Sequence, residues 1–241
     1  MYKPNSLFEL LNETDLSTTI DTFPENHALS LVFPVPDRNE SILFFQNIQH
    51  HQPNQTLTTL QKHAKTMNFL DYSALARALR RFDCFSKRNN PMASFSSVLF
   101  PLGQPQHSPW INPADIEELK EEAGFTHIQL VNGSTLRTTL TTRTIRNRSE
   151  EALSLLSLLE RDYLQSSASS PLALLQLPDT PFLRSLSKRA MLEAFPLPIG
   201  VLKEAYEKEH ALQTFLHLGH SLDPAKWNYE TFSELLTKLL T

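Results

Sequence analysis

Two short segments contain nine Lys and Arg residues, and these are the side chains of the chain whose types and spacing could support a chemical function. Residues 72–88 and 137–148 contain one carboxylate between them, Asp83. The nine are Arg77, Arg80, Arg81, Lys87, Arg88, Arg137, Arg143, Arg146 and Arg148. Their cationic groups can bind nucleic-acid phosphates, and arginine can also enter a narrow A/T-rich minor groove. A solvated helix face that pairs with the acidic residues 115–122 would explain the same composition.

The overall charge of the chain does not exclude a nucleic-acid partner. The 241 residues carry a formal net charge of −4, but phosphate responds to the local field rather than to the average. Residues 55–100 hold seven Lys and Arg against two Asp, and residues 137–148 hold four Arg and no carboxylate. Three acidic stretches, 1–54, 101–136 and 149–241, flank them. This distribution predicts a basic surface on an otherwise acidic protein.

No other set of residues has the spacing of a catalytic, cofactor or metal site. His217 and His220 have no third ligand nearby in sequence, so we expect surface histidines rather than a metal centre. Cys84 is the one cysteine, and between Phe82 and Phe85 it is typical of a small core residue. The sequence contains no nucleophile elbow, phosphate-binding glycine loop or dinucleotide fingerprint. We therefore expect no enzyme activity, no cofactor and no metal.

Hydropathy predicts a soluble, cytoplasmic protein without a membrane partner. No apolar run approaches the roughly 20 residues that cross a bilayer. Residues 1–4 are not followed by the apolar core of a signal peptide. A single cysteine suits a reducing compartment.

Short strands are expected to form the framework that positions the basic segments. Residues 28–33, 42–48 and 98–100 have the composition of strands. Asn132-Gly133, between alternating apolar residues, predicts a hairpin with a two-residue type I′ turn. Trp110 is expected to pack against this sheet rather than to stack on bases. We predict an α+β fold: a small antiparallel β-sheet with packed helices, followed by a helical C-terminal region.

Several helices are expected to accompany the strands, including one with helical spacing from Leu57 to Met67. Asp71 predicts the N-cap of a helix over residues 72–82, with its arginines opposite an apolar face. A leucine-rich helix is predicted from about residue 148 to residue 164, and either a dimer seam or burial against the hairpin explains its composition. A short acidic helix is predicted over residues 5–22, and a loop is predicted over residues 50–54.

The serine-rich run at residues 166–170 predicts a boundary between two parts of the chain. Residues 1–165 would form the α+β domain with the basic segments, and residues 171–241 a helical extension. Helices are predicted over 201–218 and 229–240. This acidic extension could cover the basic surface, bind a protein partner or complete the fold, and the sequence leaves these roles open.

One block of the sequence is similar to a known family. One stretch of the chain contains, in order, Phe100-Pro101, Trp110-Ile111-Asn112, Ile116-Glu117-Glu118 and the hairpin from Ile128 to Leu136. This order resembles the central block of the ComK family of competence transcription factors. Residues 60–73 and 81–88 resemble its middle segment more loosely. The resemblance spans roughly residues 28 to 164. The chain departs from the family pattern at Ala64 and Asn68, where Cys and Gly are usual, and in its continuation to residue 241.

This resemblance implies a function. ComK-like proteins are bacterial activators of competence (DNA-uptake) genes, and they bind A/T-rich promoter DNA from the minor-groove side as oligomers. Carried over to this chain, it implies a homo-oligomer that contacts double-stranded DNA through the nine basic residues and associates with the nucleoid. The alternative is a regulator that keeps the scaffold, binds a protein instead of DNA and uses its acidic C-terminal helices as the working surface.

Overall fold

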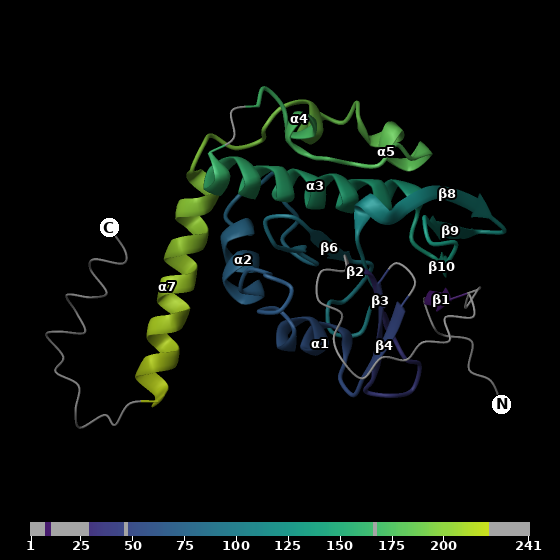
Figure 1. The fold of residues 1–241 in the computed structure, drawn as a ribbon, viewed down its shortest axis with the longest axis horizontal. Coiled ribbons are helices and arrows are strands. Elements are labelled where there is room, and N and C mark those ends of the chain that lie inside the picture. Colours follow the sequence, from purple (N-terminus) through teal and green to yellow (C-terminus); the bar gives the residue numbers. More distant parts are fainter. Residues whose placement is uncertain (1–7, 11–28, 46–47, 166–167, 222–241) are drawn as a thin grey trace, which may run out of the picture.

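Two antiparallel sheets form the framework of the protein in this computed structural model, which describes residues 8–10, 29–45, 48–165 and 168–221 (Figure 1). The first sheet has the strand order β1-β10-β9-β8. Its strands are β1 (Phe8–Leu10), β8 (Ile116–Glu122), β9 (Phe125–Leu130) and β10 (Thr135–Thr138). The second has the order β4-β3-β2-β7-β6-β5. Its strands are β2 (Leu29–Pro34), β3 (Ser41–Phe45), β4 (Ile48–Gln52), β5 (Met92–Ala93), β6 (Val98–Pro101) and β7 (Trp110–Ile111).

Helices flank the two sheets and follow them in the chain, which confirms the predicted α+β class. In order they are α1 (Thr56–Lys62), α2 (Tyr72–Leu79), the 3₁₀ helix η1 (Pro113–Asp115), α3 (Thr142–Leu164), α4 (Pro171–Leu174), α5 (Pro181–Leu186), α6 (Ala190–Glu193) and α7 (Val201–Ser221). Within the described ranges, none of these helices has the length and apolar character needed to cross a bilayer.

Helix α3 runs through the centre of the molecule, between the sheets and the helices α4 and α5 (Figure 1). All five leucines between Leu153 and Leu159 are buried within the chain, so burial rather than a dimer seam explains this leucine-rich helix. The helix begins at Thr142, several residues earlier than predicted. The Thr141 side chain caps it by accepting a hydrogen bond from the backbone N–H of Thr144 at 3.2 Å.

Helix α2 has the predicted N-cap. The Asp71 carboxylate accepts a hydrogen bond from the backbone N–H of Ala74 at 2.7 Å. The apolar side of the helix, with Leu75 and Leu79, is buried in the main core. The helix is shorter than predicted, because regular helix ends at Leu79 and turns follow.

The predicted hairpin between β9 and β10 is present, but its turn differs from the predicted one. The backbone N–H of Leu130 donates to the Ser134 carbonyl at 2.8 Å, and that of Gly133 donates to the Leu130 carbonyl at 2.9 Å. These bonds close a three-residue loop in which Gly133 has a φ of +85° and Asn132 does not have a positive φ. A type I′ turn requires both, so this prediction was wrong.

The type I′ geometry instead occurs one hairpin earlier, between β8 and β9. Glu122 pairs with Phe125, and the two residues between them, Ala123 and Gly124, have φ angles of +50° and +81°. Alanine lacks the polar side chain that makes Asn and Asp tolerant of this conformation. The sequence signal for the turn was therefore weak.

Strands β1, β4, β5, β7 and β8 were not predicted from the sequence, and two of them lie where another structure was expected. Residues 50–54 were predicted as a loop, yet His50 and His51 lie in β4, which pairs with β3 along its whole length. Phe8–Leu10, predicted as part of a helix, form β1 at the edge of the first sheet beside β10. The rest of the helix predicted over 5–22 lies outside the described residues. In both cases pairing with a neighbouring strand overrides local propensity.

Trp110 is a core residue, as predicted, but it belongs to the second sheet, whereas the hairpin near which it was expected to pack lies in the first. Trp110 is fully buried in β7, and its indole Nε1 donates to the Pro105 carbonyl at 2.8 Å. The ring of Tyr72 meets it edge-on, with 5.6 Å between centroids. The indole is therefore not exposed for stacking on a base.

The C-terminal helices share the main core with the sheets. One continuous buried cluster joins Ile128 and Leu153 to Phe182, Leu192 and Leu202. The packing gives no separation into two cores at residues 166–170, and whether residues 1–165 fold independently stays a prediction. The helix predicted over 201–218 is α7, whereas the one over 229–240 lies outside the described residues.

Candidate nucleic-acid interface

Helix α2 and the turn that follows it present three arginines on the side opposite the core. Arg77, Arg80 and Arg81 are exposed, while the intervening Ala78 and Leu79 are buried. This follows from the helical repeat of 3.6 residues, which places positions one or two residues apart on different sides. Within the described residues, the side chains of Arg77 and Arg80 take part in no ion pair.

The turn after α2 carries Lys87 and Arg88. The Lys87 ammonium donates to the carbonyl oxygens of Arg80 and Phe82 at 2.9 and 3.3 Å, and it pairs with Asp83 at 2.9 Å. It thus closes the end of α2, where carbonyl groups lack partners. Arg88 is exposed and forms no ion pair within the described part of the chain.

Hydrogen bonds join this turn to the first half of α3. The Glu151 carboxylate accepts hydrogen bonds from the backbone N–H and the hydroxyl of Ser86 at 3.0 and 2.7 Å. With its amide oxygen turned towards Arg148, Asn89 accepts a hydrogen bond from that guanidinium at 3.2 Å and donates to the Gly103 carbonyl at 2.9 Å. The two basic segments, distant in sequence, therefore meet along α3.

The three arginines in the first turns of α3 differ in their surroundings. Arg143 is exposed, whereas Arg146 and Arg148 are half-buried. The Arg148 Nη1 donates to the Pro101 carbonyl at 2.9 Å, and burial lowers the pKa of its guanidinium. Arg148 thus ties α3 to β6 and to the turn with Arg88. Its role in this structure is to position the basic segments rather than to extend into solvent.

Arg137 is the one of the nine basic residues that lies in a strand of the first sheet. It lies in β10, where its neighbours Leu136 and Thr138 face the core, and it is half-buried. Its guanidinium carbon lies 4.8 Å from the centroid of the Phe125 ring. This cation–π contact lies within the first sheet rather than on the α2 segment.

Helix α7 lies beside α2 and neutralises one of its arginines (Figure 1). The buried Glu209 carboxylate forms an ion pair with Arg81. The hydroxyl of Tyr206 accepts a hydrogen bond from the backbone N–H of Asp71 at 3.2 Å. Sequence reasoning missed Glu209 because 128 positions separate it from Arg81.

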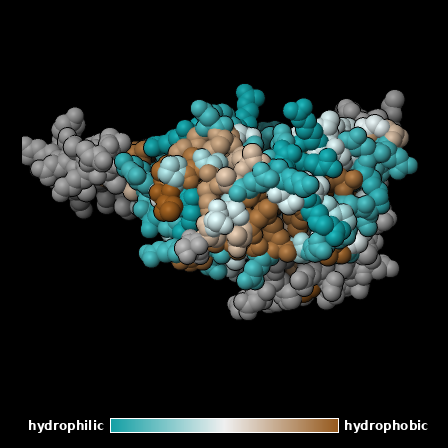
Figure 2. Space-filling view, turned by 90° about the horizontal axis from the view of Figure 1, so that it is seen from above, coloured by the Kyte–Doolittle hydropathy of each residue, from teal (hydrophilic) through white to brown (hydrophobic). Residues whose placement is uncertain are grey.

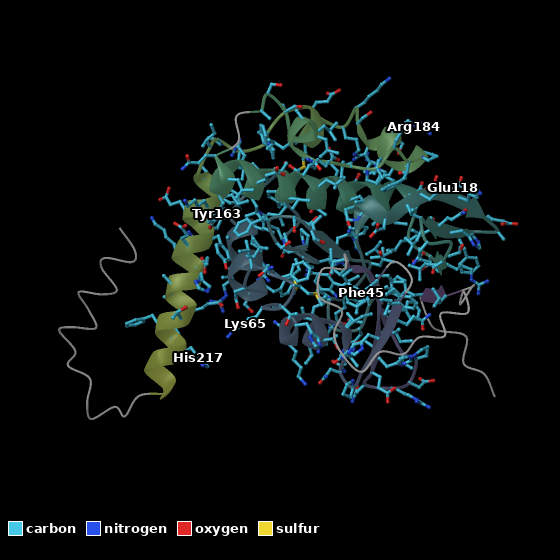
Figure 3. The ribbon with its side chains drawn as sticks, in the orientation of Figure 1. Phe45, Lys65, Glu118, Tyr163, Arg184 and His217 are labelled. Atoms are coloured by element: carbon cyan, nitrogen blue, oxygen red, sulfur yellow. The ribbon has the colours of Figure 1, made fainter. Side chains whose placement is uncertain are left out.

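The acidic strand β8 does not act as the partner of the α2 arginines. The Glu121 carboxylate accepts hydrogen bonds from the hydroxyl and backbone N–H of Thr142 at 2.8 and 3.3 Å. These two hydrogen bonds, with a smaller effect of Arg146, lower the pKa of Glu121. The acid thus caps the N-terminus of α3. Glu118 lies on the opposite side of the molecule from α7 (Figure 3).

The histidines and the cysteine do not gather into a metal site in the described part of the chain. His63 has its pKa lowered mainly by burial, with smaller effects of His50 and Lys62. Burial raises the pKa of the half-buried Cys84 thiol, which disfavours the reactive thiolate.

No protein-family model, curated protein or solved structure matches this chain. The candidate interface is defined by its charges, exposure and contacts alone. Four arginines, Arg77, Arg80, Arg88 and Arg143, combine exposure with freedom from ion pairs among the described residues.

Proposed function

We propose that this chain is a bacterial transcription activator of the ComK type that binds A/T-rich duplex DNA as a homo-oligomer. One observation carries the proposal: hydrogen bonds of Ser86 and Asn89 with α3 join a segment with several exposed arginines to a second basic segment, in which Arg143 is exposed. Such a surface would hold successive phosphates, and an arginine between the two backbones of a narrow minor groove would favour A/T-rich sequence. The proposal places the protein in the cytoplasm, on the nucleoid when bound to DNA.

The contacts assign two roles to six of the nine basic residues under this proposal. The four exposed arginines without ion pairs would contact phosphate or the groove. Arg148 and Lys87, which hydrogen-bond to backbone carbonyls, would hold the surface in shape. Only the first group should then contribute to the salt dependence of binding.

Replacing Arg77, Arg80 and Arg88 together by Ala tests the proposal. The triple variant should bind every duplex more weakly, and the slope of log affinity against log salt should shrink by about 0.9 for each phosphate that is no longer neutralised. Its thermal midpoint should hardly change, because all three side chains are exposed. Fluorescence anisotropy with a labelled A/T-rich duplex and a G/C-rich duplex of the same length measures both slopes.

A matched control removes the same charge from elsewhere. Arg38, Arg184 and Lys188 are exposed or half-exposed and lie outside the two basic segments. Their triple Ala variant should keep the wild-type slope. Wild-type protein without salt-dependent binding to either duplex would overturn the proposal.

A second candidate function is a regulator that binds a protein on the same scaffold. The observation in its favour is the ion pair of Arg81 with Glu209, which places an acidic helix beside the α2 arginines. Under this alternative, the wild-type chain would not bind the duplexes at any salt concentration.

A further inference from the structure

We infer that helix α7 is an autoinhibitory element, whose Glu209 occupies Arg81 in place of a DNA phosphate. The inference rests on the proposed function and adds its regulation. Helices α2 and α7 lie side by side, and the last turn of α2 leads directly to Arg81 (Figure 1). The arginine is about half exposed despite its ion pair, with 51% of its side-chain surface accessible.

The position of Glu209 differs from that of an ordinary surface carboxylate. Its side chain is 8% exposed, and the cation that faces it comes from the segment with the proposed DNA contacts. A carboxylate and a phosphate compete for the same guanidinium, since both accept its paired N–H donors. Glu209 also adds a negative charge where a phosphate would approach, and this charge repels DNA.

Hydrogen bonds also link α7 to the start of α2. The Tyr206 hydroxyl accepts a hydrogen bond from the Asp71 N–H at 3.2 Å. With its amide turned accordingly, Gln213 donates to the Asp71 carboxylate at 3.0 Å and accepts from the Ala74 N–H at 3.1 Å. Water can replace each of these bonds when the helices separate, so their net contribution to docking is small.

The most deeply buried apolar side chain of α7 lies near its beginning. Leu202 is fully buried, and Lys203 lies over the ring of Tyr163, near the end of α3, with 4.9 Å between Nζ and the ring centroid (Figure 3). Towards the other end of the helix, Leu216 and His217 are exposed. Apolar side chains on both sides of Glu209, among them Tyr206 and Phe215, are buried as well, and the ion pair with Arg81 and the polar contacts to α2 add to this packing.

The Glu209→Gln variant tests this inference against a matched control, Glu204→Gln. Both changes remove one negative charge from α7, but Glu204 is 69% exposed and pairs with Lys208 on its own helix. In the fluorescence-anisotropy titration, Glu209→Gln should raise DNA affinity several-fold and steepen the salt slope by about 0.9, because Arg81 then neutralises one more phosphate. Glu204→Gln should leave the slope unchanged.

A double-mutant cycle separates the ion pair from general effects of the substitution. Arg81→Ala should have little effect on the slope in the wild-type background and should abolish the gain in the Glu209→Gln background. Equal slopes for Glu209→Gln and wild type, or a gain that survives Arg81→Ala, would overturn the inference. The proposed function would still stand in that case, because it fails only if the wild-type protein itself shows no salt-dependent binding.

Discussion

At the scale of single residues, Asp115 is a carboxyl group that the fold does not favour in its charged form. Its Oδ2 has no hydrogen-bond partner among the described residues. Burial raises the pKa of Asp115 above its ordinary 3.8, and a hydrogen bond with Ser30 only partly offsets this rise. The folded state therefore holds the proton more tightly than the unfolded state. The destabilisation caused by Asp115 grows as the pH rises from 3.8 through the folded pKa.

Asp115→Asn should therefore raise the thermal midpoint at pH 7, because the neutral amide costs less to bury than the carboxylate. The gain should shrink as the pH falls towards 4, where the wild-type carboxyl is increasingly protonated. Melts of both proteins at several pH values measure the difference. Asp179→Asn, at a carboxylate with 78% of its side chain exposed, is the control. A midpoint at pH 7 equal to that of wild type would contradict the prediction.

The exposure of the α2 arginines could be predicted from helical spacing, because that pattern is local. The roles of Arg148 and Arg81 could not be predicted from the sequence. The acceptor of Arg148 is the backbone carbonyl of Pro101, and every residue has such a carbonyl, so no sequence pattern marks it. The partner of Arg81 lies on α7, which only the tertiary fold brings near.

At the scale of elements, the two hairpin turns of the first sheet should respond oppositely to substitution. Gly133 has a φ of +85°, so Gly133→Val should cost more than about 1 kcal/mol of stability. A Cβ there would meet no atom within 4 Å, so the cost is conformational rather than steric crowding. Ala123, with a φ of +50°, should accept Asn with a gain of about 0.5 kcal/mol.

Chemical denaturation of both variants measures these changes. Val131→Thr is a control in the same loop, because Val131 is 54% exposed and is not among the positive-φ residues. A decrease in stability on Ala123→Asn would show that the conformation of the β8–β9 turn is not the limiting factor.

Elements with a strong local signal were predicted from the sequence, and those fixed by their neighbours were not. Strands β2, β3 and β6 are apolar runs, and α2 has both a cap and an apolar stripe. Strand β4 contains two histidines and no alternation, and it is a strand because it pairs with β3. Helix α3 begins after the N-cap residue Thr141, ahead of the helical turns that carry its arginines. The leucine pattern further along the helix did not indicate this early start.

At the scale of the whole molecule, both sides of the predicted boundary at residues 166–170 contribute to one core. Helix α3 packs against α4 and α6, and α4 lies above it in Figure 1. On the face that carries α4 and α5, hydrophobic patches show between hydrophilic side chains (Figure 2). Buried side chains after the boundary include Phe182, Leu183, Leu186, Leu192 and Leu202. Burial of such a side chain stabilises a fold by about 1.5–3 kcal/mol.

Residues 1–165 produced alone should therefore lack a cooperative melt. Five large apolar side chains at that value amount to much of the roughly 5–15 kcal/mol typical of a whole domain. Removing them also exposes the leucines of α3 to water. Cleavage of the intact protein at an introduced protease site within 166–170 should, in contrast, leave two pieces that elute together on gel filtration, because they share a core. A purified 1–165 fragment that melts cooperatively near the midpoint of the intact chain would instead establish two independent domains. The C-terminal helices would then be a separable addition to the basic surface rather than the cover of α3.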